Sequence, residues 1–509
     1  MDWEKLLNKN RRRTSEVDEK RMDISGNTDC RNPFESDFGR VVFSSSCRRL
    51  HDKTQVFPLT SDDNIHSRLT HSMEVMNIGL SFAIYLCGNQ NFKDKTGFTE
   101  NDILRKISPI LKTSCLVHDI GNPPFGHFGE VVIQEYFKKL FANLEKVDNE
   151  NNDANEISRF IYDGLNKSQK EEMFDFLKND GLKYDYTQFD GNAEGFRVLT
   201  KLQYLGDLFG LNLTYATLAS ILKYPNYKAK SDSYIGEHKH GVFYTEKNIL
   251  DDIVSKCQLN SDDGKIYRHP LVFLMEAADS ICYYIMDVED AVQKQWINYK
   301  DLKLAIISLD NKFKERFFKA EDDVQYTKKQ WINLRTKLLT YLMEVATNEF
   351  VCNLDDIFSG KYNDELIEKD KLALYLKKLS KEKILSNRDI MSLEVTGEAI
   401  ISGILNAYIK YFFHTKDSFR ERGKTLISKS IFMTVLHEYV EKHKNEEKFK
   451  LKYDIAGNNK CINIENLYNK FDIADFSVEE RLRIIRDFIA CMTDKFALNH
   501  FRKLNGQKI

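Results

Sequence analysis

The feature that most constrains this chain is its scarcity of residues that interrupt helices. Its 509 residues include only 7 prolines and 23 glycines, roughly half the usual share. β-Sandwiches and collagen-like chains need many more turn residues than this. The stretch 69–87 shows the helical period clearly, with His71, Val75, Ile78 and Phe82 at i, i+4, i+7 and i+11. We therefore expect an all-α fold.

Charge and cysteine content exclude several classes of protein. With 75 basic and 77 acidic residues the net charge is -2. The charge of the whole chain therefore gives no sign that it binds a polyanion. No two of the nine cysteines are spaced as CxxC, which excludes a zinc ribbon and a thioredoxin-type motif. The N-terminus has no apolar signal segment, and no run of 18 uncharged apolar residues occurs. We expect a soluble, cytoplasmic protein.

Changes in composition divide the chain into four parts. Residues 1–30 are polar and predict a solvated N-terminal arm. Residues 31–300 form the expected core, with a polar surface insertion at about 145–190. Residues 301–395 read as charged amphipathic helices of an insertion or linker, and 396–509 as a C-terminal helical region that completes the site and the oligomer contacts.

Three expected helices each carry a histidine or a carboxylate on an apolar face. His71 lies on the apolar face of 69–87, where a single histidine is more often a satisfied core residue than a ligand. His118 and Asp119 end an apolar helix that begins near Asp102 and is broken near Pro109. Asp279 lies in the middle of the apolar helix 269–296, where a buried carboxylate needs a cation or donors.

These four side chains form a possible metal site. Two imidazoles and two carboxylates are a ligand set suited to Mn, Fe, Ni, Zn or Mg. After Asp119 comes a tight loop, 121–126, and then a helix expected from about Phe128 to Lys146. His127 and Glu130 are three residues apart at the start of that helix, so their side chains are expected to lie close together.

The order of these residues resembles a known family. His71, then His118-Asp119, then Asp279 reproduces the H…HD…D signature of HD-domain metal phosphohydrolases. Seven flanking segments resemble deoxyguanosinetriphosphate triphosphohydrolases: 31–40, 48–58, 68–71, 118–130, 189–197, 222–225 and 278–283. A C-terminal segment, 487–494, is also similar, with Cys491 where the family usually has glycine. The resemblance covers nearly the full length.

The resemblance implies an HD-domain helical core and a reaction at a nucleotide. The expected reaction converts dGTP, or other dNTPs, and water into the deoxynucleoside and inorganic triphosphate, with attack at the α-phosphate. His71, His118, Asp119 and Asp279 would be the metal ligands. His127 would act at the α-phosphate as acid or nucleophile, and Glu130 would orient it. In keeping with release of the whole triphosphate, the chain has no GxxxxGK[ST] phosphate loop.

The resemblance also implies a substrate-binding set. Tyr283 and Asp287 follow Asp279 at i+4 and i+8, and so share its helix face. This arrangement suits a tyrosine under a deoxyribose and an aspartate accepting from its 3′-hydroxyl. A C-terminal arginine, Arg420 or Arg422, would touch the triphosphate. The substrate-binding residues implied by the family are Gln55, Val56, Arg68, Asn192, Lys223, Tyr224, Tyr283 and Asp287.

The family further implies a cofactor and partners. The cofactor would be a divalent cation, Mn²⁺ or Mg²⁺ first and Ni, Fe, Co or Zn next. The chain would assemble as a homo-oligomer, a hexamer by resemblance, and single-stranded DNA could activate it. The arginines at 11–13 and the lysine-rich region 400–450 would offer phosphate contacts. No membrane partner is expected.

Two alternative functions remain open on the sequence. The first is another HD-superfamily enzyme, a nucleotidase or a phosphodiesterase, which would use the same four metal ligands. The pair His127 and Glu130, together with the Lys-Tyr-Pro segment 223–225, speaks against it. The second is a nucleic-acid-binding HD protein without catalysis. The intact metal and catalytic residues speak against that function.

Overall fold

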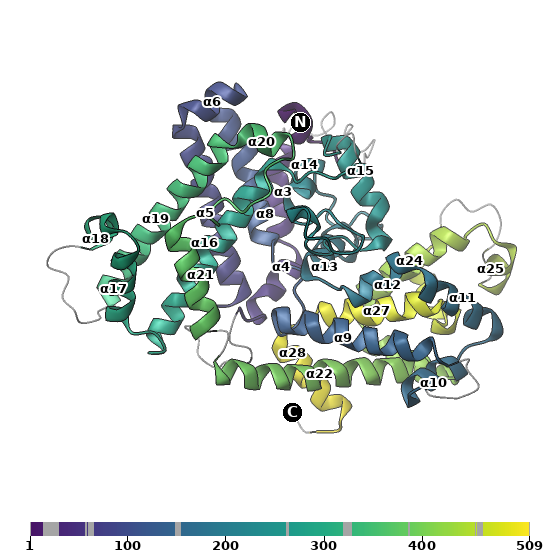
Figure 1. Cartoon of the computed structure of the whole chain (residues 1–509). Helices are drawn as coiled ribbons and strands as arrows, with labels where there is room; N and C mark the ends of the chain where they lie inside the picture. Colours follow the sequence, from purple (N-terminus) through teal and green to yellow (C-terminus); the bar gives the residue numbers. More distant parts are fainter. Residues whose placement is uncertain are drawn as a thin grey trace.

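The computed structural model describes residues 2–13, 30–55, 59, 66–147, 154–260, 264–318, 328–384, 387–453, 455 and 462–507. Over these ranges the fold consists of helices and connecting loops, and the only β-type pairings are isolated bridges (Figure 1). The expected all-α class is confirmed. None of the helices described has both the length and the apolar character that a membrane crossing requires.

A first group of helices surrounds α16 (Pro270–Gln293), whose residues are almost all buried. This helix is buried on almost every side, so other helices must cover it all round. It packs against α5 (Arg68–Gly88), α8 (Ser108–Val117), α19 (Lys328–Cys352) and α21 (Lys371–Lys383). The helix expected at 269–296 is thus present, and it is the axis of this half of the molecule (Figure 1).

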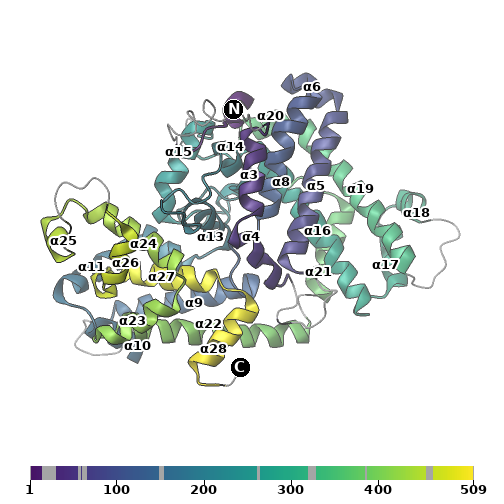
Figure 2. The ribbon, with the colours of Figure 1, turned by 180° about the vertical axis from the view of Figure 1, so that it is seen from behind.

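A second group gathers along α22 (Arg388–Phe412), the long helix at the bottom of Figure 1. It packs against α9 (Gly126–Leu144), α23 (Asp417–Leu426), α27 (Val478–Ala490) and α28 (Asp494–Leu504). Seen from behind, the yellow C-terminal helices lie beside the blue α9, although more than 300 residues separate them in sequence (Figure 2). Residues of both segments share one apolar core.

The N-terminal residues differ from the expected solvated arm. The helix α1 (Trp3–Leu6) lies on a third apolar cluster, and Leu6 is completely buried. Arg11 then pairs with the buried Asp37 at 2.6 Å. Apolar burial and this ion pair hold 2–13 on the body of the protein, while most of the remainder of the expected arm lies outside the described residues.

The helix that leads to His118 contains a wide turn. Residues Ile103–Ile107 form a π-helical turn between α7 (Glu100–Asp102) and α8. Pro109, which lacks an N–H, therefore sits in the first turn of α8 without interrupting the rod. The expected break is a local widening instead, and α8 ends at Val117, with His118 at its cap.

The other helices complete the fold around these two groups. The remaining α-helices are α4 (Ser45–Arg49), α6 (Gln90–Thr96), α10 (Glu156–Asp163), α11 (Lys167–Lys178), α12 (Asp180–Thr187), α13 (Gly191–Arg197), α14 (Tyr215–Ile221), α15 (Lys247–Cys257), α17 (Tyr299–Leu309), α18 (Asn311–Phe317), α20 (Leu354–Phe358), α24 (Lys429–His443), α25 (Glu447–Lys452), α26 (Ile464–Lys470) and α3 (Pro33–Val42). A second π-helical turn covers Val198–Leu202, and 3₁₀ turns cover Leu50–Asp52, Ile235–Glu237, Tyr244–Glu246 and Ile473–Asp475.

Two of the expected parts of the chain, 301–395 and 396–509, can be compared with the helices of the structure. The helix α22 runs through residue 396, at which a C-terminal region was expected to begin. The region 301–395 contributes α19 and α21, which pack directly on α16 and share its apolar core. Both observations have the same cause, because these helices bury apolar faces against the core rather than span a linker.

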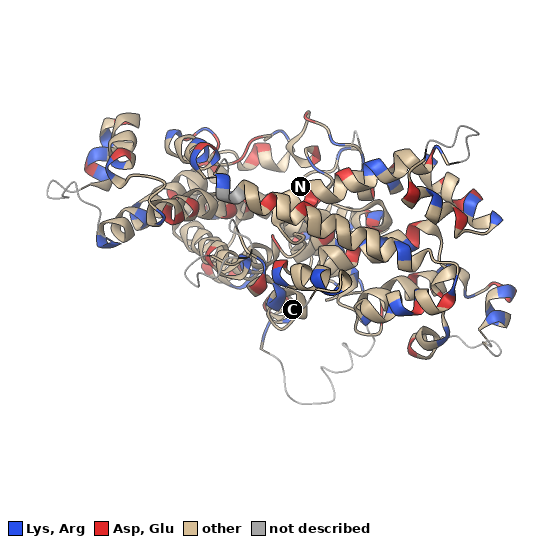
Figure 3. Cartoon of the chain, turned by 90° about the horizontal axis from the view of Figure 1, so that it is seen from below, with Lys and Arg blue, Asp and Glu red and all other residues tan. Residues whose placement is uncertain are grey.

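Buried charges connect the middle of the chain to its C-terminal helices. Arg197 donates from Nε to Asp487 at 2.8 Å and from Nη1 to Glu246 at 2.6 Å, and all three side chains are fully buried. The segment 189–197 thereby meets the segment 487–494. On the surface, by contrast, Lys and Arg are interspersed with Asp and Glu along the helices seen from below (Figure 3), as the net charge of -2 suggests.

Candidate active site between the two helix groups

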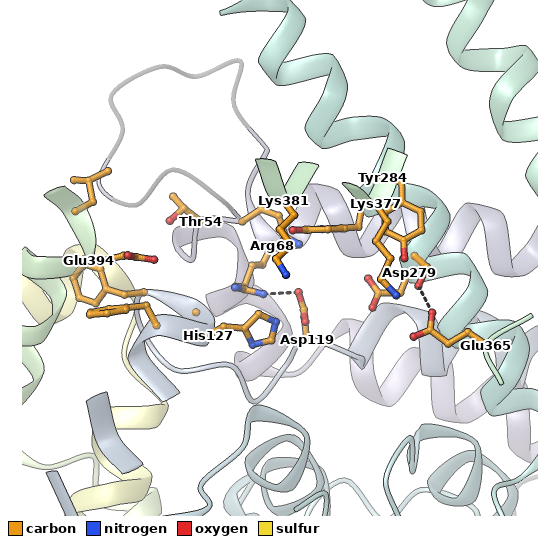
Figure 4. A pocket seen from close by; sticks show the side chains of 17 residues that line it. Thr54, Arg68, Asp119, His127, Asp279, Tyr284, Glu365, Lys377, Lys381 and Glu394 are labelled. Carbon is orange, nitrogen blue, oxygen red and sulfur yellow. Dashed lines mark hydrogen bonds and ion pairs between the residues drawn. The ribbon is translucent and has the colours of Figure 1, made fainter. Parts of the chain in front are cut away.

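A cavity of about 610 Å³ lies where the two helix groups meet. The first group contributes Arg68 of α5 and Asp279 of α16, and the second contributes His127 of α9 and Glu394 of α22. Figure 4 shows these side chains converging from different helices. A cavity of this size can hold a nucleotide.

The four expected metal ligands come together, and two of them, Asp119 and Asp279, line the cavity. His71 of α5 has Nε2 3.2 Å from Oδ1 of Asp279, and His118 has Nε2 3.3 Å from the same oxygen. Asp119 approaches His118 to 3.6 Å. One ligand atom from each of His71, His118 and Asp119 lies within 4.8 Å of the others. The cluster therefore has the compactness of a single-cation site.

The donor set fits a divalent cation. Nδ1 of His118 lies 2.8 Å from the carbonyl oxygen of Cys115, an arrangement in which Nδ1–H donates and Nε2 faces the carboxylates. Nε2 of His118 is buried and makes no hydrogen bond to the described residues. Burial lowers the pKa of His118, but Asp119 and Asp279 outweigh it and raise the pKa to about 9. Such a buried, electron-rich cluster suits a cation.

Arg68 connects the cluster to the loop that follows it. Its Nη1 donates to Oδ2 of Asp119 at 2.5 Å, and its side chain lines the cavity. Gly126 lies against the same guanidinium, and a Cβ added there would lie 2.5 Å from Nη2 of Arg68. Gly126 also has a φ of +59°. Both the space and the backbone conformation therefore favour glycine at this position.

His127 and Glu130 form the expected pair. Because α9 begins at Gly126, two residues earlier than expected, both residues lie in its first turns. Nδ1 of His127 is 2.9 Å from Oε2 of Glu130, and this hydrogen bond raises the pKa of His127. Oε1 of Glu130 accepts from the N–H of Gly191 at 2.8 Å. The buried carboxylate is thus held from behind, whereas the imidazole is 73% exposed and faces the cavity.

The loop before α9 is anchored by a residue that the motifs did not single out as functional. Asp494, at the start of α28, accepts from the N–H of Phe125 at 2.9 Å, and Phe125 has a φ of +64°. The other carboxylate oxygen accepts from Thr54, from N–H at 3.0 Å and from the hydroxyl at 2.5 Å. One buried carboxylate therefore holds two walls of the cavity.

The two residues of α16 that were expected to contact the sugar lie at or next to the cavity. Tyr283 lines the cavity, and Asp287 lies one turn further along, buried. Ser380 of α21 donates to Oδ2 of Asp287 at 3.3 Å and lies 3.5 Å from the hydroxyl of Tyr283. Burial, assisted by the charge of Asp290, raises the pKa of Asp287 to about 8.

Of the other expected substrate residues, some line the cavity and some do not. Gln55 lines the cavity, but Val56 lies outside the described residues. Lys223 lies behind the cavity wall, with Nζ 3.4 Å from Glu276 and 5.7 Å from the ring centre of Tyr224. Neither Lys223 nor Tyr224 is among the cavity-lining residues.

Two further expected contacts lie away from the cavity wall. Asn192 is turned inward, where its amide donates to Oδ1 of Asp190 at 2.7 Å. Arg420 of α23 is held in the second helix group by Asp472 at 2.6 Å and by the carbonyl oxygen of His414. Arg422, the other candidate for the triphosphate, lies over the ring of Phe419. The expected C-terminal arginine is therefore not among the residues that line this cavity.

The cavity also contains charged residues that the sequence did not suggest. Lys377 and Lys381 of α21 line it, as do Glu365 and Glu394 (Figure 4). They come from the region 301–395, which has the composition of an ordinary charged helical surface. The one available signal is the i, i+4 spacing of the two lysines, and that spacing is common on solvated helix faces.

Comparisons with known proteins show the family of this chain. A search against models of protein families finds none that matches the chain. A deoxyguanosinetriphosphate triphosphohydrolase-like protein of Listeria innocua is 34% identical over 99% of this chain and 100% of its own length. The deoxyguanosinetriphosphate triphosphohydrolase of Cronobacter sakazakii is 32% identical over 92% of this chain and 93% of its own, and that of Yersinia pestis is 30% identical with the same coverage. The chain therefore belongs to the deoxyguanosinetriphosphate triphosphohydrolase family.

Proposed function

We propose that this protein is a metal-dependent dGTP triphosphohydrolase, which converts dGTP and water into deoxyguanosine and inorganic triphosphate. One observation carries the proposal. His127, which is hydrogen-bonded to the buried Glu130, lines the same cavity as Asp119 and Asp279, and these two aspartates are clustered with His71 and His118. An acid–base pair beside a cation site is the equipment that attack on a phosphate ester requires.

The cation would be held by His71, His118, Asp119 and Asp279, and Mn²⁺ or Mg²⁺ are the first choices. When bound, a divalent cation supplies Lewis acidity at the α-phosphate and at the attacking water. Arg68, which already donates to Asp119, adds a fixed positive charge beside the same phosphate. Its planar guanidinium can donate to Asp119 and to a phosphate oxygen at once.

The protein's own acid would be His127. Water attacks the α-phosphorus, the bond from phosphorus to the 5′-oxygen breaks, and the imidazolium gives its proton to the departing 5′-oxygen. A proton from the attacking water then restores the imidazolium. The hydrogen bond that His127 donates to Glu130 raises the pKa of His127, which favours the protonated form that this step needs.

The base would lie at the opposite end of the cavity from the cation. Phe125 and Phe128 line this end together with Glu394, whose pKa is raised by burial. The aromatic rings offer a surface on which a purine can stack. The Glu394 carboxyl group offers acceptors for the N1–H and the 2-amino group of guanine, whereas adenine presents no N1–H. This arrangement favours dGTP among the dNTPs.

Product analysis tests the proposal. The purified protein is incubated with Mn²⁺ or Mg²⁺ and each of the four dNTPs or GTP, and the products are separated by ion-exchange chromatography. We expect deoxynucleoside and intact triphosphate, most rapidly from dGTP, and no reaction with a chelator or with the His127→Ala variant. Monophosphate and pyrophosphate, or inorganic phosphate alone, would instead identify a different HD phosphohydrolase.

The expected assembly and regulation remain predictions. A homo-oligomer, a hexamer by resemblance to the family, predicts a mass in sedimentation several times that of the 59.6 kDa chain. Activation by single-stranded DNA predicts a faster release of triphosphate at limiting dGTP when an oligonucleotide is added. If lysines and arginines contact the phosphates of the DNA, the activation should weaken as the salt concentration rises.

A further inference from the structure

The helix α21 presents two lysines to the candidate active site. Lys377 and Lys381 are one turn apart, so they lie on the same side of the helix, and both line the cavity. Figure 4 shows them on the side of the cavity that also holds Arg68 and Asp279. Neither lysine takes part in any of the ion pairs found among the described residues.

The position of α21 is set by the residues on its other face. Leu372 and Leu376 are completely buried in the core that surrounds α16. Ser380, which is also buried, donates to Asp287 at 3.3 Å. The backbone of α21 is therefore held in place by packing, whereas the flexible lysine side chains can adjust to a bound ligand.

The charges around the lysines leave a place for an anion. Arg68 is already engaged by Asp119, and Lys223 lies behind the wall beside Glu276. The charge of Lys377 lowers the pKa of Glu365, but the burial of that carboxyl group has the larger effect and raises its pKa. The cavity thus contains two further cations beside a site that would hold a nucleotide's α-phosphate.

We propose that Lys377 and Lys381 bind the β- and γ-phosphates of the nucleotide and hold the triphosphate as it leaves. This inference rests on the proposed function for the placement of the α-phosphate at the His/Asp cluster. A lysine acts on phosphate as a point charge on a long stem, so two of them tolerate a mobile, highly charged group. Once the bond to the 5′-oxygen has broken, the free triphosphate carries more negative charge than it did in dGTP, and the lysines stabilise this charge.

The test uses three single variants of the full-length protein with Mg²⁺. Lys377→Gln and Lys381→Gln remove the charges that line the cavity. Lys378→Gln is the matched control, because Lys378 lies on the same helix with a 72% exposed side chain and pairs with Glu382 at 3.8 Å, outside the cavity. Circular dichroism checks that all three remain folded.

Two readouts are measured: the affinity for inorganic triphosphate by calorimetry, and kcat/KM for dGTP. Each cavity variant should weaken triphosphate binding and lower kcat/KM by roughly tenfold, the loss of one charge-assisted hydrogen bond. Inhibition by deoxyguanosine, which has no phosphate, should be unchanged. Replacement of either lysine by arginine should retain most of the affinity for triphosphate.

Two results would overturn the inference: wild-type affinity for triphosphate in both cavity variants, or an equal loss in the Lys378→Gln control. The outcome is separable from that of the proposed function. If the wild type cleaves dGTP and the cavity variants bind triphosphate normally, only the role of the lysines fails. If the wild type binds triphosphate through the lysines but cleaves no dNTP, the proposed reaction fails and the anion site stands.

Discussion

At the scale of single residues, Glu130 has two contacts that suit it to position a catalytic histidine. One of its oxygens accepts from His127 and the other from the N–H of Gly191, which is 61 residues away in the chain. Gly191 permits this approach, because a Cβ there would lie 2.7 Å from the Glu130 carboxylate. A carboxylate held at both oxygens cannot turn away from the imidazole.

The Glu130→Gln variant tests this role through the pH dependence of activity. The hydrogen bond that His127 donates to Glu130 is the largest cause of the raised pKa of His127. An acid with a raised pKa stays protonated to higher pH, so activity should be lost only when the pH rises through that raised value. Without the carboxylate charge, the alkaline limb of kcat/KM should move to lower pH, and the rate below it should fall by about a hundredfold.

An alkaline limb that stays in place in Glu130→Gln would contradict the assignment of His127 as the acid. Glu135→Gln is a suitable control. Glu135 lies on the same helix, α9, but is exposed and pairs with Lys138. Its replacement should leave both the rate and the pH profile as in the wild type.

Asp494 gives a second prediction at this scale. The Asp494→Ala variant leaves the N–H of Phe125 without its acceptor and frees Thr54, so the free energy of unfolding should fall by about 1–3 kcal/mol. The kcat should fall as well, because His127 follows the released loop. Urea unfolding and dGTP hydrolysis measure the two effects. Asp494→Asn keeps one acceptor oxygen and should lose less of each, and an equal loss in both variants would contradict the anchoring role.

At the scale of elements, α16 places three functional side chains on one face. Asp279, Tyr283 and Asp287 follow one another at intervals of four residues. The helical period alone aligns them on one side of the helix, in the order in which the proposed function needs contacts to the cation, the sugar and the 3′-hydroxyl. Ser380 of α21 contacts the last two, so the sugar side and the lysines of α21 are connected through one buried hydroxyl.

This alignment predicts how the enzyme discriminates between deoxyribose and ribose. A tyrosine against the sugar would crowd a 2′-hydroxyl, so the Tyr283→Ala variant should accept GTP better relative to dGTP. The ratio of kcat/KM for dGTP to that for GTP should fall by about tenfold, the size of one steric contact. Tyr85→Ala is the control, because Tyr85 lies on α5 and does not line the cavity. An unchanged ratio in Tyr283→Ala would place the discrimination elsewhere.

Most elements could be predicted from the sequence, and the exceptions have local causes. The helix expected at 269–296 occupies Pro270–Gln293, because its apolar pattern and the proline at its start are both local signals. The break expected at Pro109 is instead a π-helical turn, whose widening depends on packing around Ile103 and Ile107. The early start of α9 depends on Asp494, a contact across 369 residues.

At the scale of the whole molecule, a buried ion network joins the middle of the chain to its C-terminal helices. Arg197 bonds to Asp487 and Glu246, and Lys201 bonds to Glu246 and lies beside Glu438. Charges taken out of water are tolerated only when each has partners. The C-terminal segment 487–494 is therefore part of the fold around the candidate active site. Its resemblance to a family motif is explained by this structural role of Asp487 and needs no contact between Asp487 and substrate.

The Arg197→Met variant tests the network. It removes a cation and leaves buried carboxylates without their partner, so the free energy of unfolding should fall by about 3–5 kcal/mol. Chemical denaturation followed by both circular dichroism and activity is the measurement. Arg316→Met is the control, because the Arg316–Glu344 pair is exposed and should contribute less than about 1 kcal/mol. Equal losses in the two variants would contradict the network's role.

The sequence by itself determined the helical class and the order of the metal-site residues. Helical periodicity is a local property, and the histidines and aspartates stand out because polar groups on apolar helix faces need partners. Only the tertiary structure decided which other residues reach the site. Ser380, Lys377 and Lys381 look like ordinary polar surface residues in sequence, and Asp494 stands out only as the last residue of a segment that resembles the family. All four acquire a role through contacts made when distant helices pack. Such contacts depend on the three-dimensional arrangement of the helices, which no local pattern records.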